Sequence, residues 1–123
     1  MANSISKILR KNKHDYKVTG SLWIEYERER FFGPGRVELL RRIEQTGSIN
    51  KAAKAMKMSY KKAWEMIDSL NRQASTPMVI VKTGGEHGGG SEITRDAKDL
   101  IRYHDALRKR FIAFLEKETR KLS

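Results

Sequence analysis

The stretch that most constrains this chain is residues 47–70, which reads GSINKAAKAMKMSYKKAWEMIDSL. Two apolar patterns at helical spacing follow one another there. The first consists of Ile49, Ala52, Ala53 and Met56, and the second of Ala63, Ile67, Leu70 and Ala74. A serine stands before each pattern, Ser48 and then Ser59, and its hydroxyl can accept a hydrogen bond from a free backbone N–H at the start of a helix. The sequence therefore predicts two short amphipathic helices joined by a tight turn.

Such a helix pair has two interpretations. It is either a plain αα-hairpin inside a helical domain or a helix-turn-helix unit, which inserts its second helix into the major groove of DNA. The small side chains of Ala52 and Ala53 allow the close helix crossing that a short turn imposes, and they fit both structures. The pattern alone gives the two interpretations about equal weight.

The net charge of the chain helps to decide between the two interpretations of the helix pair. The 123 residues include 26 Lys and Arg against 15 Asp and Glu, a net charge of +11 with a pI near 10.1. This balance favours an anionic partner, first of all double-stranded DNA, with an acidic membrane surface or an acidic protein as alternatives. The length fits one domain with a modest core.

Composition also excludes several classes of protein. The chain has no cysteine, which excludes disulfides, thiolate metal sites and cysteine nucleophiles. The absence of cysteine also fits a protein of a reducing compartment. No apolar run is long enough to span a bilayer, and the N-terminus lacks the apolar core of a signal peptide. We therefore expect a cytoplasmic protein that is not embedded in a membrane.

The segment before the helix pair predicts a strand hairpin and a further helix. Residues 22–26, LWIEY, alternate as in a half-buried strand, and residues 27–32, ERERFF, suggest the hairpin return. The turn lacks the Asn-Gly or Asp-Gly pair that most strongly signals a hairpin. Apolar residues from Val37 to Ile43 then indicate a helix that stops at Gly47.

The segment after the helix pair predicts a second hairpin. Pro77 ends the second helix, residues 78–82 have the β-branched character of a strand, and residues 91–94 form the return beyond a glycine-rich loop. The order of elements is hairpin, three helices, hairpin. We therefore predict a mainly α fold with small β hairpins (α+β), a winged helix-turn-helix at residues 18–95.

The two ends of the chain are interpreted separately. Residues 1–17 are a basic arm or helix that grips phosphates or packs on a partner subunit, or else a solvated terminus. Residues 96–123 predict a long C-terminal dimerisation helix, with Thr94 as its cap. Its apolar seam follows alternating four- and three-residue steps through Leu100, His104, Leu107, Phe111 and Phe114. We expect this seam to pair with the same helix of a second subunit; packing along its own domain is the alternative.

Several motifs carry a specific resemblance. They are GSINKAAKAMKMSYKKAW, the Asn71 that follows it, the TGG and GGG of the wing, Ile93-Thr94 after the wing, LWIE near the start and GPGRVELLRRI ahead of the helix pair. Together they resemble the N-terminal DNA-binding domain of the molybdate-responsive regulator ModE, itself similar to the winged helix of LysR-type regulators. The resemblance covers roughly residues 22–107, and it implies a homodimer that binds operator DNA.

Two departures from that family matter. Members normally carry molybdate-binding modules after this domain, whereas this chain stops at Ser123, so we expect no molybdate-binding module and no molybdate sensing by the chain itself. Lys57 also stands where related turns often have glycine, which predicts a slightly different turn.

The predicted DNA surface centres on the start of the second helix. Base-edge contacts specify sequence, and phosphate contacts fix the register. We assign Tyr60 and Lys61 to base edges, and Ser59, Lys62 and Arg72 to the DNA backbone. The remaining candidates lie at the start of the first helix and in the wing: Ser48, Asn50, Lys51, Lys82 and His87.

Two further side chains have alternative roles. Trp64 either stacks against sugar-phosphate or packs as a large core residue, and packing is favoured. Glu65 either accepts from a cytosine amino group or pairs with Lys61, and pairing is favoured.

Other functions find little support. The glycine-rich loop lacks the Gly-Lys-Ser/Thr ending of a phosphate-binding loop, and His14, His87 and His104 lack metal-ligand spacing. No nucleophile–base pair is present, so we expect neither an enzyme nor a metal or cofactor. Besides a sequence-specific regulator, two rivals stay open: a nonspecific architectural nucleic-acid binder, and a protein-interaction adaptor whose charge serves solubility.

Overall fold

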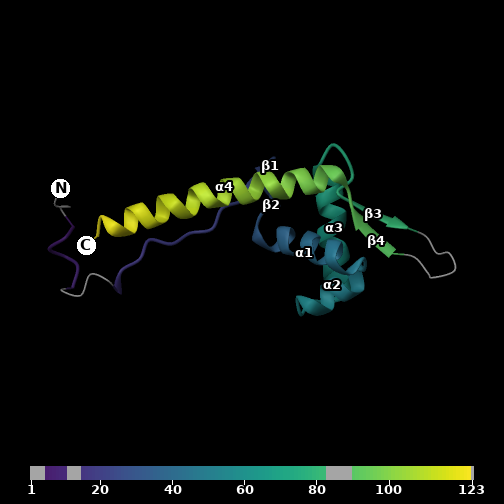
Figure 1. Cartoon of the computed structure of the whole chain (residues 1–123), viewed down its shortest axis with the longest axis horizontal. Coiled ribbons are helices and arrows are strands. Elements are labelled where there is room, and N and C mark those ends of the chain that lie inside the picture. Colours follow the sequence, from purple (N-terminus) through teal and green to yellow (C-terminus); the bar gives the residue numbers. More distant parts are fainter. Residues whose placement is uncertain (1–4, 11–14, 83–89, 123) are drawn as a thin grey trace. The chain divides into compact units, whose positions relative to one another are not determined.

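The structure, a computed structural model, describes residues 5–10, 15–82 and 90–122. Its elements follow one another in the order β1 (Ile24–Tyr26), β2 (Glu29–Phe32), α1 (Pro34–Thr46), α2 (Ile49–Ala55), α3 (Tyr60–Gln73), β3 (Val79–Lys82), β4 (Gly90–Ile93) and α4 (Arg95–Arg120) (Figure 1). Each pair of strands is an antiparallel hairpin. The predicted α+β fold, a winged helix-turn-helix followed by a long C-terminal helix, is confirmed.

The chain divides into two compact units. One is Trp23–His104, and the other combines Met1–Leu22 with Asp105–Ser123. The helix α4 is continuous across this division, so its first turns belong to the winged-helix unit.

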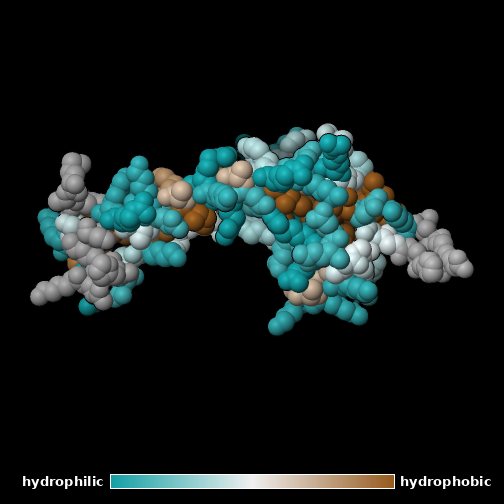
Figure 2. Space-filling model, viewed as in Figure 1, coloured by the Kyte–Doolittle hydropathy of each residue, from teal (hydrophilic) through white to brown (hydrophobic). Residues whose placement is uncertain are grey.

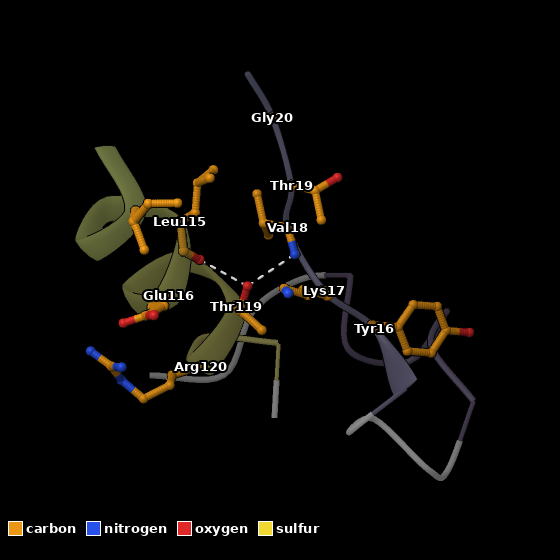
Figure 3. A pocket seen from close by; sticks show the side chains of 10 residues that line it. Tyr16, Lys17, Val18, Thr19, Gly20, Leu115, Glu116, Thr119 and Arg120 are labelled. Atoms are coloured by element: carbon orange, nitrogen blue, oxygen red, sulfur yellow. Dashed lines mark hydrogen bonds between the residues drawn. The ribbon is translucent and has the colours of Figure 1, made fainter. Parts of the chain in front are cut away.

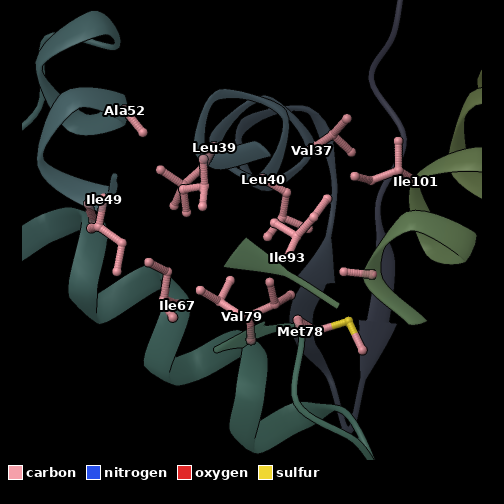
Figure 4. Packing of buried hydrophobic residues seen from close by; sticks show 14 of the residues in the cluster. Val37, Leu39, Leu40, Ile49, Ala52, Ile67, Met78, Val79, Ile93 and Ile101 are labelled. Atoms are coloured by element: carbon pink, nitrogen blue, oxygen red, sulfur yellow. The ribbon is translucent and has the colours of Figure 1, made fainter. Parts of the chain in front are cut away.

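The core of the winged-helix unit is built from all of its helices (Figure 4). Leu39 and Leu40 of α1 and Ile67 of α3 are almost completely buried in it. His104 of α4 is also buried, with 1% of its surface exposed, and its ring stands edge-on to Phe32 with centroids 5.4 Å apart. The expectation that His104 lies at a dimer interface is therefore wrong, because its side chain is enclosed by its own unit.

The ends of the three central helices follow their sequence signals. Gly47 takes a left-handed conformation with φ 69° and ends α1. The hydroxyl of Ser48 accepts from the Lys51 N–H at 3.1 Å, and that of Ser59 accepts from the Lys62 N–H at 3.0 Å. Both predicted N-caps are confirmed, and they fix where α2 and α3 begin.

The first hairpin uses an unusual pair of turn residues. Glu27 and Arg28 both have positive φ, 48° and 69°, which is the requirement of a type I′ turn. Neither is the asparagine or glycine that adopts this conformation at low cost. The hairpin that the sequence suggested is therefore present without its usual turn signal.

In the second unit, an extended segment runs along the last turns of α4 (Figure 3). The Val18 N–H donates to Thr119 Oγ1 at 2.9 Å, and this hydroxyl donates to the Leu115 carbonyl at 2.8 Å. Gly20 lies against the Phe111 ring, because a Cβ at Gly20 would stand 3.2 Å from that ring. Phe111 therefore packs on its own chain.

Candidate nucleic-acid interface

The first turn of α3 projects its side chains outward. Tyr60 is 52% exposed, and Lys61 and Lys62 are exposed beside it. The opposite face of the helix is buried through Ala63 and Ile67. Because that face holds α3 against the core, its outward residues are presented on a rigid element, as recognition through a groove requires.

The exposed face beyond the first turn carries mixed charge. Glu65 and Asp68 are exposed there, followed by Arg72 near the end of the helix. No ion pair joins Lys61 to Glu65 among the described residues, so the favoured pairing is not formed. The two carboxylates repel phosphates. The N-terminal end of α3 is therefore the part best suited to approach DNA.

Trp64 takes the packing role that its sequence position favoured. It is partly buried and packs against the core, and the Tyr60 ring meets it edge-on at 6.2 Å between centroids. It also lines a notch of about 200 Å³ between the start of α2 and the wing. Packing therefore positions the ring, and the residue stays partly exposed.

The notch gathers four of the predicted DNA-binding residues. Ser48 and Asn50 line it from the start of α2, Tyr60 from α3 and Lys82 from β3. The other exposed candidates on the helices do not line it: Lys51, Lys61, Lys62 and Arg72. His87 lies outside the described residues.

The base of the wing is tied to the helix pair. The Ser91 N–H donates to the Gly47 carbonyl at 2.9 Å, and a Cβ at Gly90 would stand only 3.2 Å from the same oxygen. Lys82 Nζ lies 3.0 Å from Glu92 Oε2 across the hairpin, with both side chains mostly exposed. The hydrogen bond between Ser91 and Gly47 fixes the direction of the wing. The ion pair restrains Lys82, the one wing lysine in the described strands.

Two polar residues that sequence reasoning did not assign to a structural role hold this surface in place. Arg36 donates to the Phe31 carbonyl at 2.7 Å, to Gln73 Oε1 at 2.6 Å and to Ser69 Oγ at 2.9 Å. Asn71 Oδ1 accepts from the Met78 N–H at 2.8 Å. Arg36 thus joins the end of α3 to β2, and Asn71 joins α3 to the start of the wing.

The environment of Arg36 disfavours its charge. Burial lowers the pKa of its guanidinium, the nearby positive charge of Arg72 lowers it further, and Glu29 opposes the change. Arginine keeps its proton under such conditions because its guanidinium is a very weak acid. The hydrogen bonds to neutral oxygens therefore stabilise a partly buried cation.

The described residues offer little for other chemistry. They contain no group of three or more His, Cys, Asp or Glu side chains that could hold a metal ion. Within the described part of the chain, no helix is both long and apolar enough to cross a bilayer.

The arrangement defines a class of protein, the winged-helix proteins: a helix-turn-helix with a tied β-hairpin beside its second helix. A solved structure, of a variant of Lactococcus lactis ZitR, shares the fold with a TM-score of 0.51 at 14% identity, covering 92% of this chain and 74% of that one. No protein-family model matches the chain.

Within this class, the chain is similar to the ModE regulators. It is 42% identical over 86 residues to the transcriptional regulator ModE of Haemophilus influenzae, a match covering 70% of this chain and 34% of that protein. It is 38% identical over 88 residues to the molybdenum transport protein ModE of Azotobacter vinelandii, covering 72% and 33%. It is 37% identical over 86 residues to the DNA-binding transcriptional dual regulator ModE of Escherichia coli, covering 70% and 33%. The matched region is thus about a third of the length of these relatives, and it resembles their N-terminal winged helix-turn-helix domain.

Proposed function

We propose that this chain is a sequence-specific, DNA-binding transcriptional regulator that acts as a homodimer in the bacterial cytoplasm. The first turn of α3 enters the major groove, and the wing meets the backbone or the minor groove. The observation that carries this proposal is the capped, exposed first turn of α3 on a helix whose other face is buried. The names of the ModE relatives support the regulatory role.

The charge pattern of α3 favours sequence reading over purely nonspecific binding. A net charge of +11 is sufficient for nonspecific attraction to phosphates. Glu65 and Asp68, however, place carboxylates on the exposed face of the helix that would lie in the groove. Such groups weaken indiscriminate binding, and they are compatible with a site whose bases present donors to them.

Selection from a random pool of duplex DNA with the purified chain tests the proposal. We expect enrichment of a near-palindromic sequence with half-sites about one helical turn apart, because two recognition helices related by a twofold axis enter successive major grooves. Retention of an unenriched pool would instead identify a nonspecific binder. Absence of retention at low salt would identify a protein-interaction adaptor.

Substitution of Lys61 tests the placement of α3. Lys61→Ala is expected to relax specificity at one position of each half-site, with a cost of about 1–3 kcal/mol. The matched control is Lys98→Ala, which removes the same charge from α4, where Lys98 faces Glu44 at 3.7 Å. Equal preference and affinity in Lys61→Ala and the unmodified chain would show that α3 is placed wrongly.

The homodimer rests on the outward face of α4. Phe114 is 55% exposed, and Leu100 and Leu107 are partly exposed. Leu107 and Phe114 are available to a second subunit, and Leu100 is available in part because it also packs against the core. His104 is enclosed, and Phe111 contacts its own chain. Sedimentation velocity with Leu107→Asp tests this role, and we expect the dimer to dissociate.

A further inference from the structure

An open pocket lies in the second unit, between residues 16–20 and the last turns of α4 (Figure 3). Its volume is about 480 Å³, within the roughly 300–1,000 Å³ of small-molecule sites. The hydrogen bond from the Val18 N–H to Thr119 Oγ1, 2.9 Å long, joins its two walls. All of the lining residues belong to this one compact unit. The pocket is therefore formed independently of the winged-helix unit.

Part of the pocket is apolar. Leu115 is 9% exposed, and Val18 and Ile112 are partly buried in the lining beside it. The Thr119 hydroxyl is already engaged, because it accepts from Val18 and donates to the Leu115 carbonyl. Apolar residues interrupt the otherwise hydrophilic surface along the C-terminal half of α4 (Figure 2). A hydrocarbon group would gain free energy by leaving water for this part of the pocket.

The charged side chains of the pocket come from both of its walls. Lys17 belongs to the extended segment, and Glu116 and Arg120 belong to α4. Glu116 and Arg120 are four residues apart, so they extend from the same side of the helix, as Figure 3 shows. Two positive charges and one negative charge give the lining a net charge of +1. This balance favours a ligand with a single negative charge.

The two positive side chains are exposed and are not held by a carboxylate. Within the described ranges, no ion pair includes Lys17 or Arg120. Lys121, the neighbour of Arg120, is different, because its Nζ lies 2.7 Å from Glu118 Oε2. A carboxylate suits the pocket, since it can accept two hydrogen bonds from a guanidinium and is also attracted by an ammonium group.

We propose that this pocket binds a small organic monoanion, a carboxylate on a short hydrocarbon chain. The carboxylate accepts hydrogen bonds from Arg120 and Lys17. The hydrocarbon lies against the apolar lining, which is formed by Val18, Ile112 and Leu115. The bound anion bridges the extended segment and α4. The site shares no residue with the predicted DNA surface, so it does not depend on the proposed function.

Calorimetric titration of the purified full chain with hexanoate tests the ligand class. We expect saturable binding of one hexanoate per chain, and octanoate is expected to bind about tenfold more tightly because it buries two more methylene groups. Hexanol, hexylamine, acetate and the dianion adipate are each expected to bind at least tenfold more weakly than hexanoate. Equal affinity for hexylamine and hexanoate would overturn the proposal, as would the absence of saturable hexanoate binding.

Substitution of the exposed cations tests the position of the carboxylate. Lys17→Gln and Arg120→Gln are each expected to weaken hexanoate binding about tenfold, because each removes a charged hydrogen-bond donor. The matched control is Lys121→Gln, which removes the same charge from a residue that does not line the pocket and is expected to leave the affinity unchanged. Similar affinities in all three variants would overturn the assignment of Lys17 and Arg120.

Substitution of Glu116 gives an expected gain, which a damaged fold would not produce. Glu116→Gln removes the negative charge of the lining, so we expect hexanoate to bind several-fold more tightly and adipate to approach it in affinity. Weaker binding of both anions would contradict the charge argument.

A series of chain concentrations separates a ligand site from a surface that a second copy covers. The affinity for hexanoate is expected to stay constant over a tenfold range of chain concentration. Binding that weakens as the chain concentration rises would show that another copy occupies the pocket, and it would overturn the proposal.

Discussion

At the scale of single residues, Lys57 shows how a turn can be kept without its usual residue. Related turns often place glycine there, and a slightly different turn was expected. Instead Lys57 itself takes the left-handed conformation, with φ 56°. Its N–H donates to the Lys54 carbonyl at 3.1 Å, and the Met58 N–H donates to the Ala53 carbonyl at 3.0 Å. This is the Schellman ending that normally uses glycine.

The strain at Lys57 gives a stability prediction. Lys57→Gly is expected to raise the free energy of unfolding by about 0.5–1 kcal/mol, because glycine removes the roughly 1–2 kcal/mol cost of a left-handed residue while losing more entropy on folding. Lys57→Val is expected to lower it by about 1–2 kcal/mol, since a β-branched side chain fits this conformation poorly. Urea unfolding measures both. Lys54→Gly, the same change inside α2, is the control and is expected to destabilise; similar effects of glycine at both positions would refute the strain argument.

Local signals at single residues could be predicted from the sequence, whereas distant partners could not. The caps at Ser48, Ser59 and Thr94 were recognised because each acts on the backbone within three residues of itself. Arg36 gave no such signal, because its partner Gln73 is 37 residues away. The hydrogen bond from the Ser91 N–H to the Gly47 carbonyl could not be predicted from the sequence either. It joins two backbone atoms, and these are the same whatever the residue types.

At the scale of elements, the first hairpin carries a cost that can be removed. Its turn places Glu27 and Arg28 at positive φ, which asparagine and glycine adopt more easily. Replacing the pair by Asn-Gly is expected to raise the free energy of unfolding by about 1 kcal/mol. Replacing it by Val-Val is the control and is expected to lower it. Thermal unfolding followed by circular dichroism measures the change, and no gain from Asn-Gly would mean that the strain is offset elsewhere.

The wing illustrates how an ion pair can limit binding. Glu92 Oε2 lies 3.0 Å from Lys82 Nζ. In the proposed complex with DNA, this carboxylate would compete with a phosphate for the lysine. Glu92→Gln is expected to raise DNA affinity several-fold at low salt, because the lysine then loses no partner on binding. The comparison variant is Glu44→Gln, which releases Lys98 on α4 in the same way. Equal gains in both variants would point to net charge alone rather than to the wing.

The helix α4 shows what a periodic apolar pattern in the sequence cannot predict. Its seam was predicted as one surface, yet its members are divided between the core, the chain's own N-terminal segment and positions that are partly or largely exposed. A four- and three-residue repeat places residues on one side of a helix. It does not state what covers them, because Phe32 and Gly20, which do so, are distant in sequence.

At the scale of the whole molecule, net charge and subunit number together set the salt dependence of DNA binding. Each phosphate that a lysine neutralises adds about 0.9 to the slope of log K against log salt. In a homodimer each substitution is present in both subunits, so it changes two contacts with one DNA site. Lys62→Ala is therefore expected to reduce the slope by about 1.8 in a dimer and by about 0.9 in a monomer. Fluorescence anisotropy over a series of salt concentrations measures this.

The same series separates the roles of the two neighbouring lysines. A phosphate contact acts equally on all sequences, so Lys62→Ala should weaken selected and unrelated duplexes alike. A base contact acts on the selected duplex alone, so Lys61→Ala should lower the affinity ratio between the two duplexes while its slope on the unrelated one changes little. If Lys62→Ala changed the ratio and Lys61→Ala changed the slope, the two assignments would be exchanged, because both side chains are exposed on the same turn of α3.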